Sequence, residues 1–218
     1  MGTRLIEQAF VCPICGRSFT AKVVESVTHQ GQDSDFYPHY IGDNPLPHFL
    51  VQCKECFYCA YPDDFFTDHN SVPGLKMNQI QEILNQPIAK KIPQEGLRFF
   101  LAGKLYEIQK RNPYLIGNLY LRGSWCCRLA QDRRAEIELQ QLSVKFLRES
   151  VERTTISNPD NVAIVTYLVG EIYRRLEDKN LAREWFKTVE ENLVDPEQQQ
   201  WLLELTRNQA ELNEHFIN

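Results

Sequence analysis

Hydrophobic and polar residues follow two different patterns along the chain. Near the N-terminus, the Thr- and Val-rich run from Ser18 to Val27 is typical of a β-strand. From Gly96 onward, apolar residues recur at intervals of three and four, which predicts amphipathic helices. Because the breaks between these helices are short, we expect neighbouring helices to be antiparallel. Six helices are predicted in this part, at roughly residues 96–111, 114–131, 133–156, 160–177, 180–194 and 196–216.

The segment 67–95 separates the two patterns. Pro and Gly residues interrupt it, and one short stretch, Met77 to Leu84, has apolar residues at helical spacing. We interpret this segment as a linker that contains a short helix. The chain is therefore predicted to have an N-terminal module at residues 1–66, this linker, and a helical domain at residues 96–218.

A repeated spacing occurs within the helical part. The pattern G-x2-Y-x8-A-x3-F of the tetratricopeptide repeat is present at Gly170, Tyr173, Ala182 and Phe186. The same spacing occurs 47 residues earlier, with cysteine at the tyrosine position, at Gly123, Cys126, Ala135 and Leu139. In such a repeat, a glycine lets the first helix approach the second closely. The spacing predicts a short tetratricopeptide-like array of antiparallel helices.

The composition is that of a globular protein. The chain has 218 residues, of which 43% are hydrophobic and 24% charged, so one long or two short domains are expected. No apolar run approaches the roughly 18 residues of a membrane-spanning helix, and the first residues lack the apolar region of a signal peptide. We therefore expect a soluble, cytoplasmic protein without membrane contact.

Charge is distributed unevenly along the chain, although the net charge is only -5. Residues 1–75 carry 4 Lys or Arg against 9 Asp or Glu, whereas residues 98–134 carry 8 against 2. The basic stretch can dock the chain's own acidic module through exposed ion pairs that salt would weaken, attract an acidic partner, or be a solvated face. Its candidate partner-binding residues are Arg98, Lys104, Lys110, Arg111 and Arg122.

Four of the seven cysteines form two Cys-x-x-Cys pairs, Cys12 with Cys15 and Cys53 with Cys56, separated by 37 residues. Two such pairs can present four thiolates to one ion, which is the ligand set of a structural Zn2+ site. A thioredoxin-like redox pair is the alternative, but a predicted strand follows the first pair, where a redox pair would precede a helix. We predict one structural Zn2+ held by these four cysteines. The fold class is then α+β, mainly α, with a zinc-ribbon-like module followed by helices.

Other polar residues of the module leave alternatives open. Cys59 could replace one of the four cysteines, although packing beside the site is the favoured interpretation. His39 and His48 lie between the two pairs and could also bind a metal. Asp33 and Asp35 could serve as an acid and a base or bind a hard cation, but we favour a role in forming turns.

The order of the motifs around the cysteines is specific. Cys12-Pro13-x-Cys15-Gly16 is followed by Asp33-x-Asp35-Phe36, by Tyr40-x-Gly42-x-Asn44-Pro45 and, after the second Cys-x-x-Cys, by Tyr58-x-Ala60 and Asp64-Phe65. This order resembles a bacterial family of unknown function, with a four-cysteine zinc-ribbon-like segment followed by tetratricopeptide-like helices. The resemblance spans nearly the whole chain and implies the same four cysteines as ligands. The sequence differs from the family at Phe57, where glycine is usual, and at Cys59, where a small residue is usual.

These features favour a non-enzymatic adaptor or scaffold whose helices bind another protein or peptide. Tyr120 and Tyr167, three residues before the repeat glycines, would line an aromatic groove for that partner, unless they pack between helices. The first alternative is an RNA-binding protein, which the acidic module makes unlikely. The second is a metal-dependent enzyme or a thiol redox protein, but four thiolates leave no coordination position for a substrate.

Overall fold

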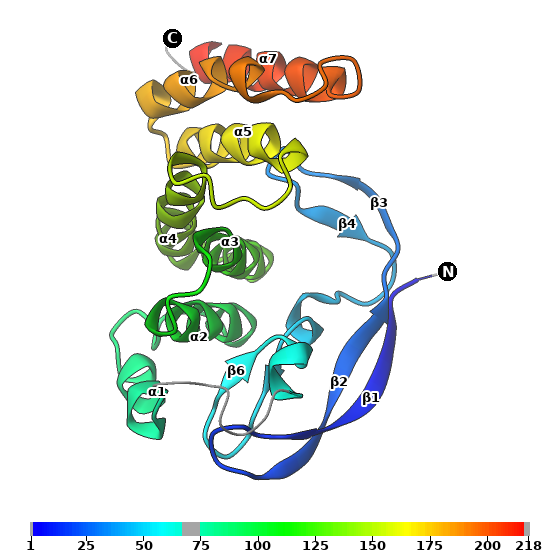
Figure 1. Ribbon diagram of the computed structural model, residues 1–218, viewed down its shortest axis with the longest axis vertical. Coiled ribbons are helices and arrows are strands. Elements are labelled where there is room, and N and C mark those ends of the chain that lie inside the picture. Colours follow the sequence, from blue (N-terminus) through cyan, green and yellow to red (C-terminus); the bar gives the residue numbers. More distant parts are fainter. Residues whose placement is uncertain (1, 67–74, 216–218) are drawn as a thin grey trace.

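A computed structural model describes residues 2–66 and 75–215 of the chain (Figure 1). Residues 67–74 of the predicted linker and residue 216, the last of the sixth predicted helix, lie outside this range. The N-terminal module contains three two-stranded antiparallel sheets. They are formed by β1 (Arg4–Val11) with β2 (Ser18–Ser26), β3 (His29–Gln32) with β4 (Pro38–Tyr40), and β5 (Val51–Gln52) with β6 (Cys59–Ala60). Two 3-10 turns accompany them, η1 (Leu46–His48) and η2 (Pro62–Phe65).

The rest of the described chain is helical, as predicted. The elements are α1 (Met77–Leu84), α2 (Gln94–Ile108), α3 (Pro113–Leu129), α4 (Arg133–Glu152), α5 (Asp160–Arg175), α6 (Lys179–Lys187), η3 (Glu190–Asn192) and α7 (Gln200–His215). Helix α1 is the short helix expected in the linker. Among the helices, consecutive pairs from α2 to α6 pack most extensively against each other, and α1 contacts α2 less extensively. Among the described residues, no helix is both long and apolar enough to cross a membrane.

Side-chain capping defines several helix boundaries. Asn112, Asp132 and Asp178 accept hydrogen bonds from the first turns of α3, α4 and α6. The predicted helix over 180–194 ends earlier, at Lys187, and the last helix begins at Gln200 instead of residue 196. The Asp195 carboxylate accepts hydrogen bonds from the amides of Glu197 and Gln198, which stabilises a turn where a helix was expected.

The two repeat glycines lie at close contacts between helices. A Cβ atom on Gly123 would come within 2.9 Å of the Leu139 side chain, and one on Gly170 within 2.7 Å of the Phe186 ring. Both distances are too short for a methyl group, so only glycine lets α3 reach α4 and α5 reach α6 at this separation. The close contact that the spacing predicts is therefore confirmed in both helix pairs.

The module lies along one side of the stacked helices (Figure 1). The β6 strand contacts α2 near one end of the stack, and the loop between β3 and β4 reaches α5 near the other. Buried residues of the module and of the helices belong to one continuous hydrophobic core. The helices thus provide one wall of the core that the small sheets need, because two-stranded sheets are marginal on their own.

Candidate metal centre

Each Cys-x-x-Cys pair forms a turn of the same geometry. In the first turn, the Gly16 amide donates to the Cys12 carbonyl and the Cys12 amide donates to Arg17. In the second, the Phe57 amide donates to the Cys53 carbonyl and the Cys53 amide donates to Tyr58. Gly16 has φ of 71°, and Phe57, at the equivalent position, has φ of 64°. The second turn therefore keeps the geometry of the first without its glycine, at a cost of about 1–2 kcal/mol for a left-handed non-glycine residue.

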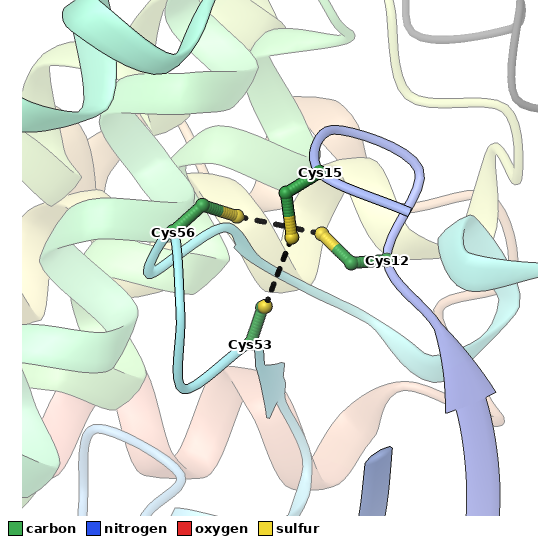
Figure 2. Close-up of side chains that lie close together, drawn as sticks. All are labelled: Cys12, Cys15, Cys53 and Cys56. Atoms are coloured by element: carbon green, nitrogen blue, oxygen red, sulfur yellow. Dashed lines mark hydrogen bonds between the residues drawn. The ribbon is translucent and has the colours of Figure 1, made fainter. Parts of the chain in front are cut away.

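The two turns bring four sulfur atoms together (Figure 2). The Sγ atoms of Cys12, Cys15, Cys53 and Cys56 all lie within 4.8 Å of one another. The distance between the Cys12 and Cys56 sulfurs is 3.4 Å, and that between the Cys15 and Cys53 sulfurs is 3.6 Å. Four thiolates around a tetrahedral ion, each about 2.3 Å from it, lie about 3.8 Å apart. The four cysteines are therefore positioned to hold one metal ion.

The electrostatics of the four thiols also favour a cation. Contact with the Cys56 thiol lowers the pKa of Cys12 to about 5, while the same contact and burial raise the pKa of Cys56. The first thiol to ionise thus suppresses the ionisation of its neighbour, because two adjacent negative charges repel each other. Three of the four side chains are buried, with only Cys15 partly accessible. A central cation is what allows all four thiols to ionise together.

Comparisons with known proteins bear on this site. A family model described as "Uncharacterized protein conserved in bacteria (DUF2225)" matches residues 5–213. The chain belongs to the DUF2225 family. The match covers the module and the helices, so the family resemblance expected from the motifs is confirmed. The comparisons with curated proteins and with solved structures found no match.

The other candidate ligands of this DUF2225 protein lie apart from the four-cysteine cluster. Cys59 is fully buried in β6, where burial raises its pKa to about 12. The His39 ring bonds to Asp33 at 2.7 Å, and His48 lies in η1, where burial lowers its pKa. Among the residues that the structure describes, the four cysteines are the single group of possible ligands.

The two aspartates that could have formed an acid and base pair are held in ion pairs instead. Asp35 is fully buried, accepts a hydrogen bond from Trp125 Nε1 at 3.1 Å, and pairs with Arg128 and with Arg175 at 3.4 Å. Burial alone would raise the pKa of Asp35, but hydrogen bonds from Arg128 and Trp125 and the charges of Arg128 and Arg175 hold it below its usual range. Asp33 also accepts from Arg128, at 3.0 Å. These carboxylates attach the module to α3 and α5.

Besides Arg128, three residues of the basic stretch contact the module. Arg98 donates to the Pro47 carbonyl at 2.9 Å, and Arg111 pairs with Asp64 at 2.7 Å. The Arg122 guanidinium lies 5.1 Å from the centre of the Phe49 ring. Of the other two candidates, Lys104 pairs with Glu107 within α2, and Lys110 follows the end of that helix. The basic stretch therefore serves largely to dock the acidic module, one of the uses predicted for it.

The expected aromatic groove requires a correction. Tyr120 and Tyr167 are both fully buried, so neither is accessible to a partner. Tyr120 donates to Glu107 and packs against Phe146, because these helices are close enough to enclose it. Tyr167 donates to the Ser34 carbonyl at 2.8 Å, so at this position the chain's own loop takes the place expected for a partner.

Sequence reasoning missed two groups that hold this loop. Trp125 gave no signal within a helix rich in apolar residues. Arg175 lies outside the basic stretch, in a segment with an acidic balance, so its charge gave no sign of docking the module. The contact becomes visible only in three dimensions, where the buried Asp35 pairs with Arg128 and Arg175.

Proposed function

We propose that this DUF2225 protein is a non-enzymatic, cytoplasmic scaffold that holds one structural Zn2+ and binds another protein through its helices. The observation that carries the proposal is the buried set of four cysteines. Four thiolates on one ion make a closed site without a position for substrate. Such a site contributes folding free energy to the module and no chemistry of its own.

Zinc is the metal that this ligand set favours. Four sulfur ligands in tetrahedral geometry suit Zn2+ or iron, and the four sulfurs lie close enough for a single ion. Zn2+ has no redox chemistry, which agrees with a site that fixes the shape of two turns. A reducing compartment such as the cytoplasm keeps the thiols available for the metal.

The surface for a partner is proposed at the end of the helix stack. The module covers one side of the stack and ends beside α7, where the Phe36 ring lies 6.3 Å from the Trp201 ring and leaves part of Trp201 accessible. Trp201 and Leu212 of α7 are both 45% exposed, and their spacing of eleven residues, about three turns, places them on one face of the helix. Exposed apolar side chains on one face are typical of protein interaction sites.

The structure gives less support to the two alternative functions, RNA binding and catalysis. An RNA-binding surface would use the basic stretch, but Arg98, Arg111 and Arg122 contact the module instead. An enzyme would need a reactive group in an accessible site, whereas the Asp35 carboxylate is buried in ion pairs.

The experiment has two parts. Elemental analysis of the protein purified without added metal should find one zinc per chain, and iron in place of zinc would contradict the choice of metal. A photo-crosslinking amino acid at position 201 or 212, introduced in cells, should give a discrete adduct with another protein. The same amino acid at the exposed Lys90 is the control. Adducts no more abundant at 201 and 212 than at 90 would exclude this face as the binding surface.

A further inference from the structure

A cavity of about 520 Å3 lies where the β1–β2 hairpin, the second cysteine turn and the start of α2 meet. Its wall includes Lys22 of β2, Lys54 and Phe57 of the second turn, and Arg98 of α2. The volume is within the range of about 300–1,000 Å3 that is usual for small-molecule sites. The cavity is separate from the helix face proposed above for a protein partner.

The wall of this cavity is positively charged in an acidic part of the protein. Residues 2–66 contain only four Lys or Arg, and two of them, Lys22 and Lys54, line the cavity. Arg98 adds a third cation from α2, whereas Glu7 is the one carboxylate on the wall. Such a concentration of cations raises the local concentration of an anion in a cleft.

Arg98 is held in place but is not fully satisfied. One terminal nitrogen donates to the Pro47 carbonyl at 2.9 Å, which fixes the guanidinium against η1. Its Nε is buried and has no hydrogen-bond partner among the described residues. Buried donors without an acceptor are rare in proteins, so the groups of the described protein satisfy this guanidinium only in part.

Phe57 is the aromatic part of the wall. Its backbone is left-handed, with φ of 64°, at the position where the first cysteine turn has Gly16. The side chain that this strained backbone presents is 41% exposed and lines the cavity. Strain of this kind persists where the side chain serves another purpose, and binding sites are common examples.

We propose that this cavity binds a nucleoside phosphate. The phosphate lies against the ammonium groups of Lys22 and Lys54 and the guanidinium of Arg98, which supply charge-assisted hydrogen bonds. The base stacks on the Phe57 ring, as bases do on exposed aromatic side chains. The Glu7 carboxylate accepts hydrogen bonds from the ribose hydroxyls, a contact that a bare inorganic anion cannot make.

The test is a calorimetric titration of the full-length, metal-loaded protein with ADP, adenosine and inorganic phosphate. ADP should bind about tenfold or more tightly than either fragment, since it alone contacts both the cations and the ring. The double variant Lys22→Ala, Lys54→Ala should lose about tenfold in affinity for ADP. Lys90→Ala, an exposed lysine outside the cavity, is the matched control and should bind as the wild type does.

The variant Phe57→Gly separates binding from folding. It removes the ring and relieves the backbone, so ADP affinity should fall about tenfold while the melting temperature rises. Absence of ADP binding to the wild type at millimolar concentration would overturn the proposal. So would equal affinity for ADP and inorganic phosphate, or ADP affinity unchanged by Phe57→Gly, because either result would reduce the cavity to a general anion site.

Discussion

Replacing Asp35 by alanine should weaken the attachment of the module to α3 and α5. The Asp35 side chain is fully buried and is the shared acceptor of Trp125, Arg128 and Arg175. Removing one partner of a buried ion pair typically costs about 3–5 kcal/mol, because the remaining charge stays buried and unpaired. Arg128 keeps Asp33 and Glu136 as partners, so we expect the loss to be near the lower end, about 3 kcal/mol.

Urea unfolding, followed by tryptophan fluorescence, measures this loss. The matched control is Asp33→Asn, because Asp33 also pairs with Arg128 but its side chain is 32% exposed. Its loss should stay below about 1 kcal/mol. The conservative variant Asp35→Asn keeps the shape of the side chain and removes the charge, so its loss should lie between the two.

A double-mutant cycle with Arg128→Met tests whether the ion pair itself is the cause. If it is, the loss from the double variant should be smaller than the sum of the single losses. The reasoning fails if Asp35→Ala costs no more than Asp33→Asn, or if the losses from Asp35→Ala and Arg128→Met simply add. Either result would mean that the ion pair between Asp35 and Arg128 does not hold the module.

Four further outcomes are expected. Cys12→Ser and Cys53→Ser should each lose the metal and unfold the module while α2 to α7 remain helical, whereas Cys59→Ser should retain the metal. Elemental analysis measures the metal content, and circular dichroism measures the helix content. Gly170→Ala should destabilise the protein by about 1–3 kcal/mol in urea unfolding, since the added methyl would overlap the Phe186 ring; the exposed Asn208→Ala is the control. The pKa of Asp35 is lower in the folded than in the unfolded protein, so its contribution to stability is complete above the unfolded pKa of about 3.9 and is lost as the pH falls through the folded pKa. Wild type and Asp35→Asn should therefore become equally stable in strong acid. A difference in stability that persists there would contradict this. The radius of gyration from small-angle scattering should stay constant as the salt concentration rises, because Asp35 is buried and the rings of Phe36 and Tyr167 pack across the same interface. Expansion at high salt would show instead that exposed ion pairs hold the module.

Local patterns predicted the elements that depend on local physics. The periodicity of apolar residues predicts α2 to α5 closely, because each helix buries one face. The spacing of Cys12, Cys15, Cys53 and Cys56 predicts the cluster, because two short turns can present four thiols to one point only in a few ways. The ends of α6 and α7 were less predictable, since the turn at Asp195 competes with the helix there.

Contacts between distant parts of the chain were not predictable in the same way. Tyr167 was expected to face a groove. The sequence does not tell whether that groove is filled by another protein or by a loop of the same chain. Asp35 and Arg128 are 93 residues apart, and no local pattern links a buried acid in a turn-rich loop to one particular arginine. The charge imbalance between the segments indicated that docking was possible, but not which residues carry it.

The loop that reaches α5 also sets an order of events during synthesis of the chain. Ser34 accepts from Tyr167 through its carbonyl, across 133 residues of sequence. A ribosome that adds about 5–20 residues per second needs roughly 7–27 s to make that intervening chain. For most of this interval the module has all four cysteines but lacks α5, which contacts its β3–β4 loop. Early binding of the metal would therefore stabilise the module until α5 is made.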